Sequence, residues 1–490
     1  MDRSNGFRKC IQDEFSHAYF LDCGGNVREI SGRDGIFICE KHTIFGEAAM
    51  TGIVIGFLVK KKKNDSCRIF YSHPFNIHEL RENKVKYIEN TSFQDILFDH
   101  ITPDKKSNWI NLTDNDFNTF LPLIGKDVKA GKSQEAIFQI FSRGVETGRD
   151  EWVFDLSESC LKSKVEYLID GYRRDLEKKG RLELDIKWDR QLERYATNGI
   201  PIDFDANQIR YGIYRPFSRQ YLYFDKHLNR MPGQASKIFP TKDSLNWAIY
   251  CTDAGTQSPF MLTATHYIPD VHLVGTAAQC VPLYRYEKNG DRIDNITDWG
   301  LTQFQTHYND STITKENIFH YTYAVLHHPA YRTKYELNLK RDFPRLPFYP
   351  DFHQWTTWGK TLMDLHLNYE TIEPHNLKRT ETATKPNPKA KLKADKTTGQ
   401  IILDENTELT GIPTIAWDYK LGNRSALEWI LDQYKEKKPK DPTIREKFNT
   451  YKFADYKEHV IDLLQRVCTV SIQTMEIIQQ MPDTVDHQKL

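Results

Sequence analysis

The chain has 490 residues, of which 39% are hydrophobic and 27% are charged. This length predicts roughly two to four domains with a sizeable core, and the composition is typical of a globular protein rather than a disordered one. The 67 Lys and Arg residues are balanced by 67 Asp and Glu residues. Because the net charge is zero, any affinity for a polyanion has to come from local basic patches.

Cysteine usage and hydropathy indicate in which cellular compartment the protein is expected. The eight cysteines are scattered with no CxxC pair, which argues against a zinc site or a disulfide framework and favours a reducing compartment. No window approaches the ~20 apolar residues of a membrane span, and the polar N-terminus is unlike a signal peptide. We therefore expect a cytoplasmic protein with no membrane partner and no metal of its own.

The first 72 residues predict the edge of an α/β sheet. Residues 7–15 have the pattern of a short helix, and residues 17–21 have that of a strand. The continuous apolar run at 51–60, TGIVIGFLVK, is typical of a strand buried on both faces, and residues 67–71 are expected to return beside it as its partner. So few elements make a poor independent domain, and we expect them to be the end of a larger sheet.

A loop punctuated by glycines follows within residues 137–154, between two predicted strands. It carries Arg143 and Arg149 beside Gly144 and Gly148, and glycine allows a ligand to approach the backbone closely. The loop lacks the lysine and the spacing of a phosphate-binding P-loop.

Residues 209–230 hold a dense mixture of basic and aromatic side chains. Such interleaving offers cations to phosphates and stacking surfaces to bases. An equally open interpretation is a core strand whose arginines only extend toward solvent. Residues 220–224 alternate as a strand does, and we expect Arg215→Ala or Arg219→Ala to weaken DNA binding with little change in melting. The basic residues of the stretch are Arg210, Arg215, Arg219, Lys226 and Arg230.

Other motifs give weaker signals. A D-x-K triplet at Asp185 and Lys187 is similar to part of a metal-dependent nuclease site, but it is common in so charged a chain and fits a plain strand as well. His327 and His328 are adjacent on a predicted helix, point about 100° apart, and are not expected to share a metal. His366 lies on an apolar helical stripe and is expected in the core.

The C-terminal part combines a polar segment with helices. Residues 378–400 contain a single large apolar residue, Leu392, and predict a flexible basic insertion. Residues 426–435 and 460–470 are expected to form helices, the second of them apolar enough to dock on a core.

Together these stretches resemble the C-terminal part of the Type ISP restriction–modification enzymes. In that family nuclease, helicase-like ATPase, coupler, adenine-N6 methyltransferase and target-recognition domains follow one another in one chain, and the activity serves phage defence. TGIVIGFLVKK and the CGGNVRE turn look like the last elements of the family's methyltransferase sheet. Further matches follow the family's order over most of residues 137–475, and they include SRGVETGRDEWVF, YRPFSRQYLYFDKHLN, YAVLHHPAYRTKY, LKRDFPRLPFYPDF and LGNRSALEWILDQY.

The chain departs from the family in what it lacks. It has no glycine loop for S-adenosylmethionine, no Asn/Asp-Pro-Pro-Tyr/Phe tetrapeptide for a flipped adenine, and no GxxxxGK[ST] motif for ATP. We therefore expect no methyl transfer by this chain alone. The resemblance implies the recognition half of a split, truncated or separately expressed gene. S-adenosylmethionine, ATP and Mg²⁺ are implied only for the complete enzyme, with an upstream methyltransferase, helicase or nuclease chain as a partner.

The predicted fold is mixed α/β (α+β), a mixed-sheet target-recognition domain with a C-terminal helical part, preceded by the last strands of a Rossmann-like methyltransferase sheet. The expected function is sequence-specific recognition of double-stranded DNA, and a stand-alone metal-dependent nuclease or a non-functional remnant are the alternatives. The expected segments are 1–72 (methyltransferase remnant), 73–125 (connection), 126–376 (target recognition), 377–412 (flexible insertion) and 413–490 (helical part). The residues expected to face DNA are Arg143, Arg149, Arg210, Arg215, Arg219, Lys226, Arg230 and Lys237.

Overall fold

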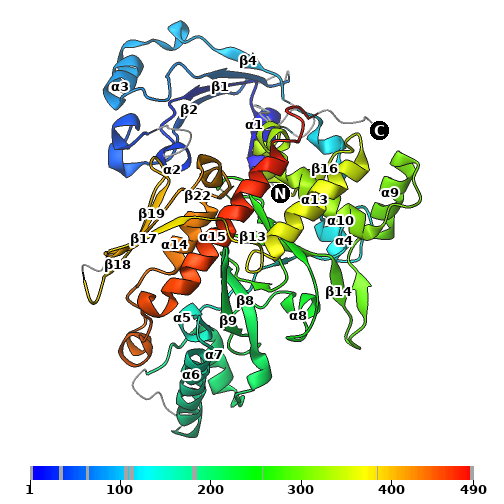
Figure 1. Ribbon diagram of the computed structural model, residues 1–490. Helices are drawn as coiled ribbons and strands as arrows, with labels where there is room; N and C mark the ends of the chain where they lie inside the picture. The colour runs from blue at the N-terminus through cyan, green and yellow to red at the C-terminus, as the bar shows by residue number, and fades with distance from the viewer. Residues whose placement is uncertain are drawn as a thin grey trace. The chain divides into compact units, whose positions relative to one another are not determined.

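The computed structural model describes residues 4–31, 37–61, 66–103, 107, 109, 115–178, 185–256, 258–382 and 385–485. The chain divides into two compact units, Met1–Asp114 and Asn115–Leu490 (Figure 1). The finer segment boundaries expected from the sequence stay predictions.

The first unit is built on one small sheet with the strand order β2-β1-β3-β4. Strand β1 is antiparallel to β2 and parallel to β3. The prediction that residues 67–71 pair with residues 51–60 is therefore wrong, because β1 lies between these two strands. The elements are α1 (Ser4–Glu14), β1 (His17–Asp22), α2 (Val27–Ile30), η1 (Glu40–His42), η2 (Gly46–Ala48), β2 (Val54–Val59), β3 (Arg68–Ser72), α3 (Arg81–Asn90), η3 (Phe93–Asp95) and β4 (Asp99–Ile101).

Strand β2 is apolar and yet exposed. Val54 is 51% exposed, and Phe57, Leu58 and Val59 are each 41% exposed. The sequence predicted burial on both faces, and that prediction is wrong for this chain because β2 is an outer strand of its sheet. An apolar outer strand with exposed side chains is a surface suited to a partner.

The second unit contains the larger part of the described elements. Its helical elements are η4 (Asp116–Thr119), α4 (Lys126–Lys129), α5 (Asp150–Val153), α6 (Glu158–Lys178), α7 (Arg190–Thr197), η5 (Ala206–Gln208), α8 (Ala235–Ile238), α9 (Asp298–Tyr308), α10 (Lys315–His327), α11 (Pro329–Lys334), α12 (Glu336–Arg341), α13 (Phe352–Leu367), η6 (Thr414–Trp417), α14 (Ala426–Gln433), the π-helical η7 (Ile444–Phe448) and α15 (Phe453–Ile478). Its strands are β5 (Leu121–Pro122), β6 (Ser142–Arg143), β7 (Phe154–Asp155), β8 (Ile209–Arg215), β9 (Ser218–Tyr223), β10 (Ala248–Thr252), β11 (Leu262–Thr265), β12 (Ile268–Pro269), β13 (Ala278–Pro282), β14 (Tyr284–Tyr286), β15 (Arg292–Asp294), β16 (Arg345–Leu346), β17 (Lys378–Glu381), β18 (Ala390–Asp395), β19 (Gln400–Asp404), β20 (Thr407–Thr410), β21 (Lys420–Leu421) and β22 (Arg424–Ser425).

Two four-stranded sheets position the region of interest, with the orders β11-β10-β13-β6 and β12-β8-β9-β7. The second sheet is mixed, because β12 is parallel to β8 while β9 is antiparallel to it. The β8–β9 hairpin, α6 and α7 lie together at the lower end of this unit in Figure 1. The architecture confirms the predicted mixed α/β class.

Helices α10 and α13 of the second unit pack closely against each other. Gly359 of α13 lies so close to α10 that a Cβ there would fall 1.8 Å from the His320 carbonyl oxygen. His366 is 2% exposed and bonds Tyr323 Oη through Nδ1 at 2.5 Å and Thr474 Oγ1 through Nε2 at 2.9 Å. Burial lowers the pKa of His366 to about 3, so its ring is neutral, and the prediction of a core histidine is confirmed.

The segment predicted as a flexible basic insertion is instead a sheet with the order β17-β20-β19-β18. Leu392 is 2% exposed, and the sheet adds buried aliphatic side chains from beyond the polar stretch, such as Leu409. Asp404 is paired with Lys457 of α15, Nζ to Oδ2 at 2.9 Å. The prediction of a flexible segment from composition was wrong because the buried residues of this sheet belong to the same hydrophobic core as those of α14 and α15. The sheet does not need a core of its own.

Candidate nucleic-acid interface

The β8–β9 hairpin carries the central basic and aromatic stretch. Its turn places Phe217 in the left-handed region, at φ 56°, with the ring buried and packed edge-on against Tyr369 at 5.1 Å between centroids. Leu222 and Tyr223 are fully buried and Phe224 nearly so, whereas Tyr221 is half-buried. The turn that was expected to present arginines to DNA is therefore anchored in the core.

Arg215 is held by a buried carboxylate. Its Nη1 lies 2.7 Å from Asp270 Oδ1, and the side chains are 18% and 2% exposed. Burial raises the pKa of Asp270 to about 6, against the lowering effect of the Arg215 charge. This pair joins β8 to the segment after β12.

Arg219 and Arg210 also form contacts with neighbouring residues of the protein. Arg219 donates from Nε to Glu370 at 3.0 Å, and its guanidinium lies 4.2 Å from the centre of the Tyr211 ring. Arg210 donates to the Phe239 carbonyl oxygen at 2.8 Å, and burial lowers its pKa. Both side chains are half-buried, so they present only part of their surface to a ligand.

Arg149 is buried, with 1% of its side chain exposed, and its Nη2 lies 2.5 Å from Asp189 Oδ2. The glycines of the same loop serve close packing within the protein rather than the approach of a ligand. A Cβ at Gly144 would fall 2.5 Å from the Asp270 carbonyl oxygen, while Gly148 adopts φ +70° against the stem of Arg230. Arg149 is therefore a buried residue, whereas the sequence predicted it on the surface.

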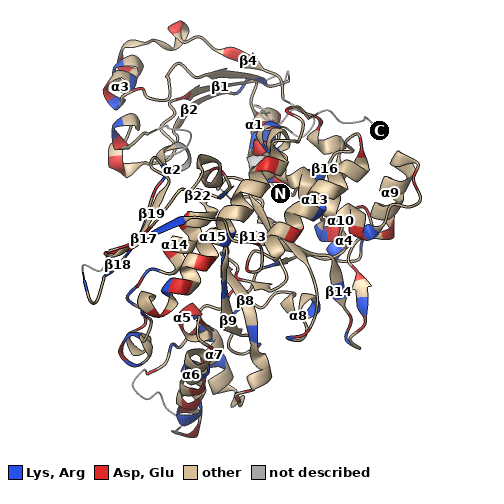
Figure 2. Ribbon diagram, in the orientation of Figure 1, with Lys and Arg blue, Asp and Glu red and all other residues tan. Residues whose placement is uncertain are grey.

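The other predicted cations are exposed. Arg143 is 52% exposed with Nε 3.7 Å from Asp253, and Arg230 is 59% exposed with Nη1 3.2 Å from Glu146. Lys226 and Lys237 are exposed as well. In Figure 2, basic and acidic residues are both scattered over the second unit.

A groove of about 580 Å³ lies beside Arg230 and extends along α7. Its lining residues are Asp189, Arg190, Gln191, Arg194, Arg230 and Met231. Arg190 and Arg194 are exposed and one helical turn apart, while Leu192 fixes the opposite face of α7 in the core. Three arginines on one concave surface suit a phosphate backbone and base edges.

Helix α7 is ordered at its start by the same residue that holds Arg149. Asp189 is the N-cap, and its Oδ1 accepts hydrogen bonds from the backbone N–H groups of Gln191 and Leu192 at 3.1 and 2.9 Å. Burial would raise the pKa of Asp189, but these N–H groups and the Arg149 charge hold it below its usual value. The sequence analysis missed Arg190 and Arg194, and the N-cap aspartate followed by arginines at i+1 and i+5 was the available signal.

The nuclease alternative gains no support from the geometry. Within the described ranges, no group of three or more His, Cys, Asp or Glu side chains is placed to hold a metal ion. Asp185 instead accepts a hydrogen bond from Tyr167 Oη at 3.3 Å. Among the helices that the structure describes, none is long and apolar enough to cross a membrane.

Fold and groove together define a mixed α/β domain with an arginine-lined surface helix. The profile of the Type ISP C-terminal specificity domain matches residues 136–463, and the chain therefore belongs to that family. This confirms the resemblance seen in the sequence. A comparison with curated proteins gives no match.

Solved structures agree with this assignment. The chain is 43% identical to the protein in a cryo-EM structure of the DrdV–DNA complex, with a TM-score of 0.84 over 98% of this chain and 49% of that one. For a nuclease-deletion mutant of the Type ISP restriction–modification enzyme LlaGI with a DNA substrate mimic, the identity is 28% and the TM-score 0.75, over 98% and 38% of the two chains. For the ATP-dependent Type ISP enzyme LlaBIII bound to DNA, the values are 25% and 0.80, over 99% and 32%. The chain thus spans half or less of the length of these relatives.

Proposed function

We propose that this chain is the DNA-recognition part of a Type ISP restriction–modification system and binds a short site in double-stranded DNA. The observation that carries the proposal is the match of 98% of the chain, at 43% identity, to a protein solved in complex with DNA. The groove beside α7 supports it independently, because Arg190, Arg194 and Arg230 supply exposed cations there. Such a role belongs in the cytoplasm, where cellular DNA is accessible.

The proposed DNA-facing set combines predicted and newly found residues. Arg143, Lys226, Arg230 and Lys237 keep the role expected from the sequence because they are exposed, and Arg190 and Arg194 join them. Arg210 and Arg219 contribute at most an edge of a half-buried guanidinium. We assign Arg149 and Arg215 to the support of the fold, since each is paired with a carboxylate at 2.5 or 2.7 Å.

We further propose that strand β2 is the contact for the rest of a methyltransferase sheet. The support is its outer position together with exposed Val54, Phe57, Leu58 and Val59. In this arrangement S-adenosylmethionine, ATP and Mg²⁺ are bound by other parts of the complete enzyme, and this chain supplies the choice of site. An upstream chain bearing the methyltransferase motifs would then co-purify with this one and shield β2 from hydrogen exchange.

Binding to labelled DNA tests the proposal directly. Fluorescence anisotropy with a mixed-sequence duplex should show affinity that falls steeply with salt, with a slope of log affinity against log salt of about −5 if about six phosphates are contacted. Selection from a random duplex pool should enrich one short motif. Absence of binding at low salt, or binding without enrichment of a motif, would contradict sequence-specific recognition.

A further inference from the structure

Arg332 is a half-buried cation of the second unit, and its Cζ lies 5.9 Å from the centre of the Phe260 ring. It lies on the short helix α11, and its Nε donates to the Leu326 carbonyl oxygen at 2.6 Å, which fixes the guanidinium plane. In the described part of the chain no carboxylate lies within 4 Å of it, and its Nη atoms make no hydrogen bond. Burial lowers the pKa of Arg332 to about 10, and it remains charged at neutral pH.

The guanidinium faces a cavity of about 290 Å³. The polar residues that line this cavity are His327, Arg332, Thr333, Asp418, Tyr419 and Lys420. Asp418 and Lys420 are both exposed, and their opposite charges offset each other, which leaves Arg332 as the net charge of the site.

Two buried polar groups of the cavity wall lack partners among the described residues. His327 is 1% exposed and bonds the Tyr323 carbonyl oxygen through Nδ1 at 2.8 Å, while its Nε2 has no partner. Tyr419 is 3% exposed, and its hydroxyl is likewise without a partner. Leaving these two buried polar atoms unpaired is costly, and a ligand beside the Arg332 guanidinium would complete them.

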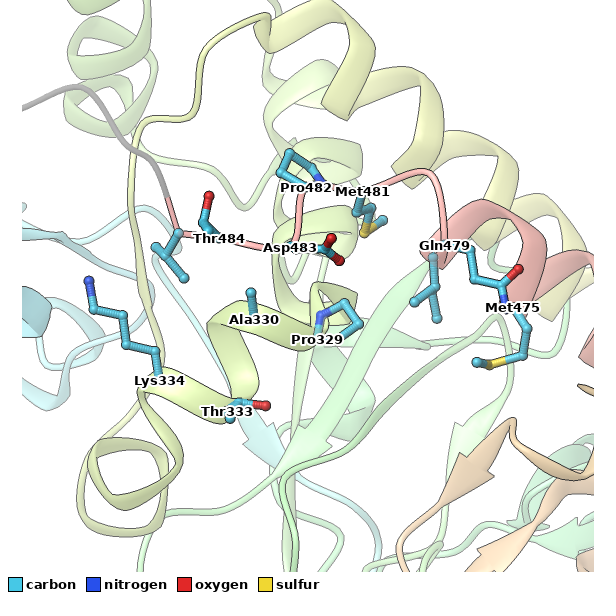
Figure 3. A pocket seen from close by; sticks show the side chains of 12 residues that line it. Pro329, Ala330, Thr333, Lys334, Met475, Gln479, Met481, Pro482, Asp483 and Thr484 are labelled. Carbon is cyan, nitrogen blue, oxygen red and sulfur yellow. The ribbon is translucent and has the colours of Figure 1, made fainter.

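The cavity adjoins a groove of about 820 Å³, and the two share the lining residues Pro329, Thr333, Met475 and Ile478. Figure 3 shows this groove between α11 and the end of α15, with Met475 and Gln479 on one side and Ala330 and Lys334 on the other. The cavity lies near the lower size limit of small-molecule sites, about 300 Å³, and the groove leaves room for a ligand to extend outward.

We propose that the cavity at Arg332 binds a small oxyanion, either free phosphate or the phosphate group of a mononucleotide. The free Nη atoms offer the two parallel donors that a phosphate accepts, which a lysine cannot offer. If the ligand is a mononucleotide, its phosphate lies on Arg332 and its nucleoside lies in the adjoining groove. This site is separate from the α7 groove, and it does not depend on the proposed DNA binding.

The test uses the full chain. Isothermal titration calorimetry with inorganic phosphate and with adenosine monophosphate, at constant ionic strength, should show saturable binding of at least one ligand. Arg332→Gln should weaken that binding at least about tenfold, because a charged hydrogen-bond pair is lost. Arg341→Gln on the following helix α12 removes an exposed charge that lines neither the cavity nor the groove, and it should leave the affinity unchanged.

The results of these titrations distinguish between the two ligands. Tighter binding of the mononucleotide identifies the groove as part of the site, and equal binding identifies phosphate alone. If Arg332→Gln does not fold, Arg332→Lys keeps the charge but loses the two-pronged contact and should still weaken binding. No saturable binding by the wild-type chain overturns the proposal, and so does a loss of DNA affinity in Arg332→Gln while neither small ligand binds.

Discussion

Arg149 and Asp189 form a buried ion pair that links the glycine-containing loop to the start of α7, with Nη2 and Oδ2 2.5 Å apart. Arg149 is 1% exposed, and its remaining guanidinium nitrogens have no hydrogen-bond partner among the described residues. Asp189 is therefore the group that compensates this charge while it also caps α7. Through that double role, the loop fixes the position of the arginines in the groove.

Replacing Asp189 with alanine should be strongly destabilising. The change leaves the buried Arg149 charge uncompensated, which typically costs about 3–5 kcal/mol, and it removes the N-cap of α7. Urea unfolding should show the loss. The matched control is Asp170→Ala, because Asp170 is 69% exposed and 3.9 Å from Arg173, and its loss should cost under about 1 kcal/mol.

The same pair predicts a dependence on acid. The pKa of Asp189 is lower in the folded chain than its ordinary value of 3.8, so its stabilising effect is complete above about pH 4 and is lost as the pH falls through the folded value. The difference in unfolding free energy between the wild type and Asp189→Ala should therefore shrink below pH 4. An unchanged difference down to pH 2 would show that the ion pair is not the source of the stability.

Arg215→Ala should destabilise the protein more at pH 7 than at pH 5. The pKa of Asp270 is raised from 3.8 to about 6 in the folded chain, so the folded state binds more protons and stability falls as the pH rises between these values, by about 3 kcal/mol in total. Without Arg215 the Asp270 carboxylate at pH 7 has lost its cation, whereas at pH 5 it is protonated and needs none.

Thermal melting at both pH values measures this effect. Arg219→Ala is the control, since Arg219 and Glu370 are 30% and 27% exposed and their pair should contribute no more than about 1 kcal/mol at either pH. This replaces the earlier expectation from the sequence that both variants melt like the wild type. Equal losses for the two variants at both pH values would show that the burial of Asp270 has no energetic consequence.

Helices of the second unit could be predicted from the sequence where their buried residues recur every three to four positions, as in α6 and α13. The sheet of the first unit could not, because the position of β1 between β2 and β3 depends on pairing and not on local pattern. The β17–β20 sheet was missed for a related reason. Its polar strands are stabilised by contacts with α14 and α15, which no local window contains.

The sequence indicates the region of the candidate site, but it does not show which of the arginines there are free to bind a ligand. The arginines stood out in the sequence, yet the carboxylates that bind Arg149 and Arg215 lie 40 and 55 positions further along the chain. Whether an arginine is free or paired is therefore a property of the folded chain. Arg190 and Arg194 belong to a helix of only eight residues, and the sequence analysis did not single it out.

Leu392→Ala should loosen the β17–β20 sheet. Leu392 is 2% exposed at a β-bulge between Ala390 and Lys393, and removal of its buried methyl groups should cost about 2–5 kcal/mol. Limited trypsin digestion should then cleave at Lys391 and Lys393, which the wild type protects. The neighbouring change Lys393→Ala, at an exposed position, should leave the other sites protected. Rapid cleavage of the wild type within this segment would contradict an ordered β17–β20 sheet and would support the flexible insertion predicted from the sequence.

The DNA-binding role of α7 is the most direct consequence of the proposed function. Arg190 and Arg194 are exposed, and neither forms an ion pair within the ranges that the structure describes. Their replacement by alanine should therefore leave the melting temperature nearly unchanged, unlike that of Arg149 or Arg215. Each variant should nevertheless bind DNA more weakly than the wild type.

The pattern of loss distinguishes the kind of contact. If Arg190 or Arg194 contacts only phosphate, its alanine variant should lose similar affinity on all sequences, and its salt slope should fall by about 1. If it reads a guanine, discrimination at one position of the selected motif should relax by about 1–3 kcal/mol, while binding to mixed sequences changes less. Arg341→Ala, at the exposed end of α12, removes the same charge away from the groove and should change neither quantity. Wild-type affinity and discrimination in the double variant Arg190→Ala/Arg194→Ala would exclude this groove as the DNA-binding surface, and the search would move to Arg143, Lys226 and Lys237.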